Sequence, residues 1–482
     1  MNLENYEFKT EPYDHQLESL EISSHHNLFA LFLEMGLGKS KILLDNAALL
    51  FEQGKISSLL IVTPKGNLRN WDIHEISKHL PDRIQRNILV WQPNHTKRWT
   101  KDFRKLVEED STGILNIFLI NVEAFATKKA CTFVEEFLVT HNAMMAIDES
   151  TTIKNPKAKR TKNLIRLGPL ADYRRILTGI TVTKAPLDLF SQCYFLSPNL
   201  LGFSSYYAFR SRYAVVQARR MGTHSFQQIV GFRKLEELQE SIKEFSIRKR
   251  KEECLDLPEK VYVKRYVELT EEQKIAYSTM KKKALMILEE ELFTTVNVLT
   301  QLMRLQQVVA GSLRNHEGET VILKNNRVQA VLDLLEETSG KVVIFAVFQT
   351  DIEELEKAIA NRFGKESVAS YFGKTPQNQR QVIIDKFQEP ESELRYFVSN
   401  PQTGGRGITL TGANTMIFYS NSYDLELRVQ AEDRIHRIGQ EHSCTYVDLV
   451  SKDTVDERIL KNLLNKVKIS NEILGEVRTW FK

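Results

Sequence analysis

The sequence Glu34-Met35-Gly36-Leu37-Gly38-Lys39-Ser40 is the stretch that decides the fold of this chain. An apolar run, residues 28–33, comes directly before it, and the apolar residues 42–44 follow it. A strand, a glycine-rich turn and a helix in this order let backbone N–H groups cradle phosphates at the helix N-terminus. The match to the strict phosphate-loop pattern is partial, because Leu33 stands where that pattern has its first glycine. The segment predicts a phosphate loop, and the alternative is a surface turn with an incidental lysine.

The residues of this loop have separate expected roles. Backbone contacts to phosphates are expected from four consecutive residues: Met35, Gly36, Leu37 and Gly38. Lys39 is expected to reach the β and γ phosphates, and Ser40 to ligate Mg²⁺. Upstream, the amide of Gln16 offers both a donor and acceptors and could read the edge of an adenine. The alternative for Gln16 is an ordinary surface residue.

Two adjacent carboxylates, Asp148 and Glu149, follow the apolar run 143–147. Side chains at the end of a buried strand face the space above the sheet, where ligands collect in such folds. Asp148 is therefore expected to hold Mg²⁺, and Glu149 to orient or deprotonate the attacking water. An Asp-Glu pair also occurs as plain surface charge, which is the competing interpretation.

Near the other end of the chain, residues 430–440 carry Arg434 and Arg437, three residues and one helical turn apart. The planar arginine fork stays charged and binds phosphate oxygens bidentately. In nucleotide hydrolysis such a group can contribute roughly three to five powers of ten in rate. The two arginines are thus predicted catalytic fingers. The alternative is a solvent-facing helical charge cluster in which Glu432 and Asp433 pair with them.

Two further segments are candidates for ligand contacts. Three glycines in four positions, Gly404, Gly405 and Gly407, suggest close approach of the backbone to a ligand, and Gly407 is a predicted nucleotide contact. A flexible loop is the alternative. Thr63-Pro64-Lys65, at the end of an apolar run, could touch a nucleic-acid backbone, or it could be a plain strand-to-helix turn.

The hydrophobic pattern predicts an α/β fold with two lobes. Short apolar runs typical of strands buried on both faces recur in a first series, residues 28–33, 59–62, 117–120, 143–147 and 175–177. A second series follows at residues 342–345, 396–398, 416–419 and 446–449. Helical patterns lie between the runs, and this alternation implies parallel sheets covered by helices.

The domain boundaries follow from the same pattern. The first lobe is expected at residues 1–246 and the second at 259–482, with a charged, proline-terminated linker at 247–258. Helical insertions are expected at about 200–245, where strand runs are scarce, and at about 270–310. Aromatic residues within 203–213 could stack on bases, although core packing is favoured, and the basic run 248–251 is interpreted as a solvated linker rather than a nucleic-acid contact.

Composition sets limits on the class of protein. The chain has 482 residues, 42% of them hydrophobic and 27% charged, and a formal net charge of +4. These values are typical of a folded multidomain protein and are compatible with nucleic-acid binding without arguing for it. Four scattered cysteines argue against a zinc site or disulfide framework and favour a reducing compartment. No secretory signal or membrane span is expected, so a cytoplasmic location is predicted.

In order along the chain, these segments resemble the motor core of the Swi/Snf-type branch of superfamily 2 helicases. Residues 34–40 look like motif I, 63–71 like motif Ia, 148–156 like motif II with its extension, and 175–179 like motif III. In the second lobe, residues 341–348, 403–411 and 430–440 resemble motifs IV, V and VI. The resemblance covers nearly the whole chain.

The resemblance implies two RecA-like lobes that close on ATP and Mg²⁺, and helical protrusions from both lobes. It implies a DNA-stimulated ATPase that tracks along duplex or branched DNA. The protein is expected to be a monomer that acts in DNA repair or recombination in a bacterial or virus-infected cell. A strand-separating DNA or RNA helicase and a non-hydrolysing nucleic-acid scaffold are the alternatives. Two positions depart from the family pattern: motif III reads Thr178-Gly179-Ile180-Thr181, and Thr151 replaces the usual histidine of motif II.

Overall fold

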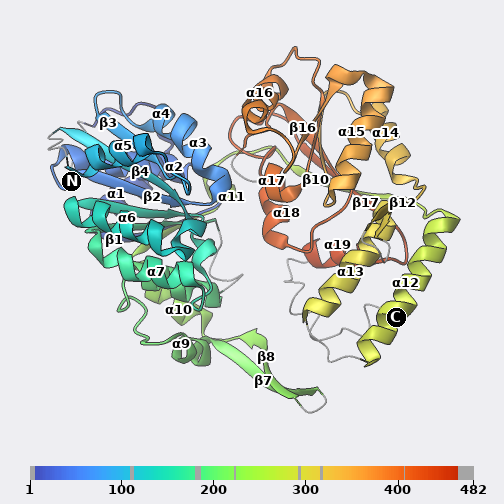
Figure 1. The fold of residues 1–482 in the computed structure, drawn as a ribbon, viewed down its shortest axis with the longest axis horizontal. Helices are drawn as coiled ribbons and strands as arrows, with labels where there is room; N and C mark the ends of the chain where they lie inside the picture. The colour runs from blue at the N-terminus through green and yellow to red at the C-terminus, as the bar shows by residue number, and fades with distance from the viewer. Residues whose placement is uncertain are drawn as a thin grey trace. The chain divides into compact units, whose positions relative to one another are not determined.

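The computed structural model describes residues 6–108, 113–179, 186–221, 224–290, 295–314, 319–405 and 408–464. The chain forms two compact units. The first unit comprises Met1–Gln217 and Gln228–Asp256, and the second comprises Ala218–Gln227 and Leu257–Lys482. Each unit is built on one parallel sheet with helices on its faces (Figure 1). The predicted α/β fold with two parallel-sheet lobes is therefore confirmed.

The sheet of the first unit has seven parallel strands in the order β3-β4-β2-β5-β6-β1-β9. Their bounds are β1 Leu28–Leu33, β2 Ser58–Thr63, β3 Gln85–Val90, β4 Ile114–Asn121, β5 Ala143–Asp148, β6 Tyr173–Leu177 and β9 Ser246–Lys249. All five apolar runs of the first predicted series are strands of this sheet. Val62 pairs with Ile147, and Leu177 pairs with both Asp148 and Leu31, so these strands end along the same edge.

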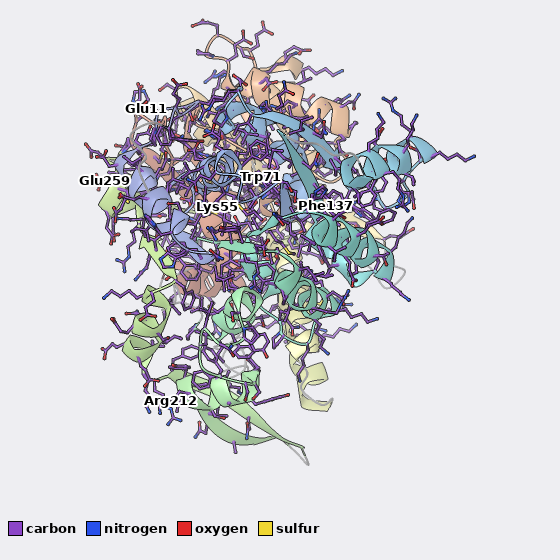
Figure 2. All side chains as sticks on the ribbon, turned by 90° about the vertical axis from the view of Figure 1, so that its left-hand side faces the viewer. Glu11, Lys55, Trp71, Phe137, Arg212 and Glu259 are labelled. Carbon is purple, nitrogen blue, oxygen red and sulfur yellow. The ribbon has the colours of Figure 1, made fainter. Side chains whose placement is uncertain are left out.

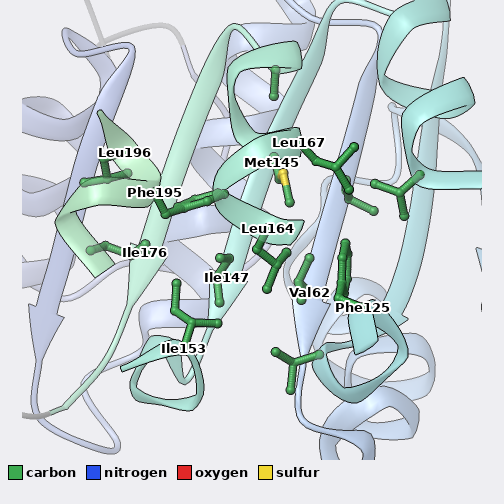
Figure 3. Packing of buried hydrophobic residues seen from close by; sticks show 14 of the residues in the cluster. Val62, Phe125, Met145, Ile147, Ile153, Leu164, Leu167, Ile176, Phe195 and Leu196 are labelled. Atoms are coloured by element: carbon green, nitrogen blue, oxygen red, sulfur yellow. The ribbon is translucent and has the colours of Figure 1, made fainter. Parts of the chain in front are cut away.

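Helices cover both faces of this sheet. On one face Ala30, Val62 and Ile147 pack against helices α5 to α10, and Figure 3 shows this packing around Leu164 and Phe195. The opposite face packs against α1, α2 and α4. The helices of the unit are α1 Asp14–Ser24, α2 Lys39–Glu52, α3 Leu68–Asn70, α4 Ile76–His79, α5 Lys97–Glu108, α6 Lys128–Thr140, α7 Lys159–Leu167, α8 Leu189–Leu196, α9 Tyr206–Tyr213, α10 Leu235–Lys243 and α11 Lys251–Cys254.

The sheet of the second unit has six parallel strands in the order β10-β17-β16-β13-β15-β14. Their bounds are β10 Lys260–Tyr266, β13 Lys341–Phe345, β14 Val368–Tyr371, β15 Tyr396–Ser399, β16 Ala413–Phe418 and β17 Cys444–Val450. All four runs of the second predicted series fall on these strands. One face packs against α14 and α15, and the other against α16 and α18.

The remaining elements of the second unit lie beside the sheet. Helices α12, α13 and α19 share a separate apolar cluster. The helices of this unit are α12 Glu271–Glu290, α13 Thr295–Ala310, α14 Arg327–Glu337, α15 Gln349–Phe363, α16 Gln377–Gln388, α17 Pro401–Gly404, α18 Leu425–Glu432 and α19 Val455–Leu464, and β11 Ser312–Arg314 pairs with β12 Thr320–Ile322. In the part of the chain that the structure describes, no helix is long and apolar enough to cross a membrane.

Four strands of the two sheets were absent from the sequence prediction: β3, β9, β10 and β14. Each stands at an end of its sheet, where one side of the strand has no neighbour. Strands in that position do not need apolar side chains on both faces, so their sequences lack a continuous apolar run. Residues 246–249 illustrate this, because Ser246, Arg248 and Lys249 are only half-buried in β9.

The region 200–245 differs from the helical insertion that we expected. It contains α9 and α10, but between them β7 Ala214–Met221 and β8 His224–Phe232 form a two-stranded sheet that extends from the helices (Figure 1). Valines and an isoleucine at 215, 216, 229 and 230 favour strands over helix, and this signal was missed. Phe209 and Tyr213 are buried in the core, whereas Tyr207 is exposed.

The expected linker at 247–258 also contains ordered structure of the first unit. Residues 246–249 pair with β1, and Lys249 forms an ion pair with Glu18 at 2.6 Å. The N–H of Lys251 donates to the Glu34 carboxylate at 3.0 Å, and α11 follows. These contacts hold the basic run 248–251 against the strand that precedes the phosphate loop.

Candidate nucleotide site

The loop between β1 and α2 owes its course to two glycines. Gly36 and Gly38 have φ angles of +83° and +79°, a left-handed conformation that costs little only for glycine. A Cβ atom on Gly38 would lie 2.2 Å from Nε2 of Gln16, so a side chain there would have to displace that amide. Leu37, between them, buries its side chain in the core. The loop therefore turns at both glycines and buries the Leu37 side chain in the core.

Lys39 and Ser40 open helix α2. The Lys39 ammonium donates to the carbonyl oxygen of Leu33 at 2.8 Å and lies 3.4 Å from that of Glu34. The lysine therefore folds back over the loop that it follows. Both side chains are half-buried, as expected for residues beside a solvent-accessible loop at a helix N-terminus.

Gln16 belongs to α1 and is buried against the loop. Its Nε2 donates to the Leu37 carbonyl at 3.2 Å, and its Oε1 accepts from the N–H of Tyr13 at 3.2 Å. Nε2 of His15 lies 3.0 Å from the same carbonyl. Burial lowers the pKa of His15, which favours the neutral ring that can donate one N–H. The amide of Gln16 thus holds the loop, and His15 is a second holder that sequence reasoning missed.

Asp148 is the last residue of β5, and Glu149 follows in a left-handed conformation with φ of +49°. For a residue with a side chain this conformation costs about 1–2 kcal/mol, and such residues gather at functional sites. Oδ2 of Asp148 accepts hydrogen bonds from Thr63 Oγ1 and Trp71 Nε1, both at 2.9 Å. Glu149 is half-buried, while Ser150 beyond it donates to Gln192 at 2.5 Å.

The segment after β6 lies against the phosphate loop. The N–H of Thr178 donates to the Leu31 carbonyl at 3.1 Å, and a Cβ atom on Gly179 would lie 3.3 Å from the backbone nitrogen of Met35. Glycine is thus needed where this segment passes the loop. Ile180 and Thr181, which depart from the family pattern, lie outside the described residues.

In the second unit, the glycine segment packs tightly where it is described. A Cβ atom on Gly404 would lie 2.3 Å from Oγ of Ser399, and one on Gly405 would lie 2.1 Å from the Pro401 carbonyl. These glycines therefore permit close approach of the chain to itself. Gly407, the predicted nucleotide contact, lies outside the described residues.

The two arginines of the second unit are not on a regular helix, as we had expected, because α18 ends at Glu432 and the chain continues in turns. Arg434 is 6% exposed, and its guanidinium donates to the carbonyls of Gln430 and Ile408, both at 2.9 Å. Arg437 is half-buried. Arg434 is thus buried and bound to backbone carbonyls, whereas Arg437, three residues later, lies nearer the surface.

Glu432 has partners other than these arginines. It accepts from Arg428 Nε at 2.8 Å, Lys260 Nζ at 3.2 Å and the Tyr262 hydroxyl at 2.8 Å. Arg428 also forms a buried ion pair with Asp448 at 2.5 Å. Glu432 is therefore committed to β10 and to Arg428, and the alternative in which Glu432 and Asp433 pair with the two arginines stays open.

Family models match most of the chain. The SNF2-related domain matches residues 16–312, and the helicase conserved C-terminal domain matches residues 324–439. The chromatin remodeling factor mit1 of Schizosaccharomyces pombe is 25% identical to this chain, over 93% of this chain and 32% of its own length. The DNA annealing helicase and endonuclease ZRANB3 of Bos taurus is 26% identical, over 92% of this chain and 38% of its own length. The chain therefore spans less than two fifths of the length of either relative.

A solved structure, the Sulfolobus solfataricus SWI2/SNF2 ATPase core in complex with dsDNA, is 24% identical with a TM-score of 0.43, covering 98% of this chain and 95% of that one. The family assignment rests on the matched models, the first of which alone covers residues 16–312 of 482. The chain belongs to the SNF2-related family of helicase-type ATPases.

Proposed function

We propose that this chain binds ATP with Mg²⁺ and hydrolyses it to move along DNA, with duplex or branched DNA as its track. One arrangement carries the proposal. The phosphate loop follows β1 and Asp148 ends β5, and only β6 stands between these strands in the sheet. Both groups therefore lie at the carboxyl edge of one parallel sheet, roughly 10 Å apart at the usual strand spacing. Ligands collect at this edge in such folds.

The residues present suit a magnesium ion. Oδ2 of Asp148 is occupied by two donors, and no donor among the described residues bonds Oδ1, which leaves that oxygen for a cation. Ser40 opens α2 beside the same edge. Bound there, the metal would neutralise charge on the phosphates during transfer. A carboxylate and a hydroxyl are the oxygen ligands that Mg²⁺ prefers.

The remaining groups of the first unit have proposed roles in the same reaction. Lys39, now on the carbonyls of Leu33 and Glu34, is proposed to exchange them for phosphate oxygens. Glu149 is proposed to orient the attacking water, and its left-handed backbone sets the direction of its side chain. Gln16 is proposed to support nucleotide binding by holding Leu37 in the loop.

In the second unit, Arg437 is the proposed finger toward the transferred phosphate. Arg434 is proposed to hold the turns that carry Arg437, because its guanidinium bonds the carbonyls of Gln430 and Ile408. Gly407 is proposed to approach the nucleotide with its backbone. A guanidinium that reaches the phosphate only in the closed state of the two units would couple hydrolysis to their movement.

The test is steady-state ATP hydrolysis by the purified protein, alone and with single-stranded DNA, duplex DNA, a four-way junction or RNA. DNA as the track is supported by the names of the relatives, a chromatin remodeling factor and a DNA annealing helicase. We expect strong stimulation by duplex or junction DNA. Stimulation only by single strands or RNA would favour a strand-separating helicase, and no hydrolysis under any condition would favour a non-hydrolysing scaffold.

A further inference from the structure

A single carboxylate oxygen joins the two ends of one segment of the first unit. Residues 63–71 begin with Thr63 at the end of β2 and end with Trp71, which opens the π-helical turn Trp71–Glu75. Both end residues donate to Oδ2 of Asp148, each at 2.9 Å. The segment is therefore an arch whose two feet meet on the carboxylate that we propose to hold Mg²⁺.

The contact is buried on all three sides. Thr63 is 0% exposed, Trp71 1% and Asp148 8%. Figure 2 labels Trp71, which lies in the interior of the first unit. In such surroundings a hydrogen bond to a charged group is stronger than one between neutral groups, and losing one of the two donors leaves the carboxylate less firmly oriented. Two donors on one oxygen therefore fix which oxygen points away from the arch.

The outer side of the same arch faces solvent. Lys65 and Gly66 are exposed, and Asn67 and Arg69 are half-buried. These residues offer an amine, a guanidinium and backbone N–H groups, which are the donors that bind nucleic-acid phosphates. The arch 63–71 is thus tied to Asp148 at its two ends inside and carries phosphate-binding donors on its outer side. A π-helical turn inside a helix is itself typical of functional sites.

We propose that Trp71 is a positioning residue: with Thr63, it orients the Asp148 carboxylate toward Mg²⁺ and transmits nucleic-acid binding on the outer arch to that carboxylate. The inference rests on the proposed function and names the contact by which a nucleic acid would stimulate hydrolysis. When phosphates bind the outer side of the arch, the hydrogen bonds from Thr63 and Trp71 to Oδ2 of Asp148 are strengthened. The carboxylate is then fixed with Oδ1 directed toward the metal. Without the indole N–H of Trp71, Oδ2 of Asp148 keeps one of these two donors, the Thr63 hydroxyl.

The test compares Trp71→Phe, which keeps an aromatic ring and removes the N–H, with Trp99→Phe as a matched control. Trp99 is also a buried indole whose Nε1 donates, in its case to the Val90 carbonyl at 2.8 Å. Thr63→Val and Thr63→Ser form a second pair, in which only serine keeps the hydroxyl donor. For each variant we would measure the melting temperature, the Mg²⁺ concentration for half-maximal hydrolysis, and the stimulation by duplex DNA.

Substituting a residue that hydrogen-bonds a metal ligand typically costs about 10–100-fold in metal affinity or activity. We therefore expect Trp71→Phe to raise the half-maximal Mg²⁺ concentration about tenfold and to reduce DNA stimulation, with Thr63→Val intermediate and Thr63→Ser and Trp99→Phe like wild type. If Trp71→Phe lowers the melting temperature but leaves the half-maximal Mg²⁺ concentration and the DNA stimulation like those of Trp99→Phe, the residue is structural and the inference fails alone. If the wild-type protein does not hydrolyse ATP, Mg²⁺-dependent binding of a fluorescent ATP analogue gives the same comparison. Absence of that binding would overturn the inference together with the proposed function.

Discussion

In both the phosphate loop of the first unit and the arginine turns of the second, hydrogen bonds from side chains to backbone carbonyls hold the chain in place. The two regions differ in which residue donates these bonds. In the loop, a side chain holds the backbone from outside, because the amide of Gln16 donates to the carbonyl of Leu37. In the turns, Arg434 is itself the holder, because its guanidinium donates to the carbonyls of Gln430 and Ile408. A charged residue in a nucleotide motif can therefore serve the frame rather than the ligand.

Replacement of Lys39 by alanine should give the largest effect. The Lys39 ammonium donates to the backbone carbonyl of Leu33 at 2.8 Å and lies 3.4 Å from that of Glu34. Groups that stabilise a transferring phosphoryl group contribute about a thousandfold or more, so ATP turnover should fall to background. The melting temperature should stay close to that of wild type. Turnover at the wild-type rate in this variant would remove the loop from the site.

The arginine pair should separate when each member is truncated. Arg437→Ala should lower turnover by about a thousandfold or more with little change in stability. Arg434→Ala leaves two buried carbonyls without donors and should destabilise the second unit by about 2–4 kcal/mol. Chemical denaturation and steady-state hydrolysis on both variants measure the difference. Equal stability of the two variants would show that the backbone bonds of Arg434 do not hold the turns.

How far each half of this comparison follows from sequence depends on distance along the chain. The places of the glycine-rich loop and of the Asp148-Glu149 pair in the fold were predictable because each lies at the end of its own strand. The burial of Arg434 was not, because Arg434 and Arg437 look alike until Ile408 and Gln430 are placed around one of them. Trp71 was missed for the same reason, since its contact with Asp148 requires β2 and β5 to be neighbours.

Alanine at Gly38 should sharpen the description of the loop. Gly38 and Gly54 both have left-handed φ angles, +79° and +67°, but a Cβ on Gly54 would meet nothing within 4 Å. Gly54→Ala thus reports the cost of the backbone conformation alone, about 1–2 kcal/mol. Gly38→Ala adds the clash with Gln16 and should cost more in stability and weaken nucleotide binding. Identical effects of the two substitutions would mean that Gln16 moves aside freely.

Acid should weaken the first unit by a smaller amount. Burial lowers the pKa of His79 to about 4, and its Nδ1 lies 2.8 Å from Oγ1 of Thr10. Since the unfolded histidine titrates near pH 6.5, the unfolded state binds more protons between pH 6.5 and 4. Stability should therefore fall as the pH drops through this window and level off below it, by up to about 2 kcal/mol from this group.

The control for the acid effect is His79→Asn, which keeps a polar group near Thr10 but has no proton to gain. Unfolding followed at several pH values should show a shallower loss in this variant than in wild type. His15, His26 and His141, also in the first unit, have lowered pKa values as well, so part of the loss should remain. Curves that superimpose would assign the whole acid effect to those other groups.

The pairing of β9 with β1 has a consequence for how the protein is made. β1, which ends at the phosphate loop, lies between β6 and β9, yet β9 comes more than two hundred residues after it (Ser246–Lys249 against Leu28–Leu33). Until the ribosome has released residue 249, the apolar strand Leu28–Leu33 has one open side, and open apolar strand edges recruit other chains. A fragment that ends before residue 246 should therefore aggregate, although it contains every residue of the phosphate loop. The strand that leads into the phosphate loop therefore gains its second neighbour only after residue 249 has been translated.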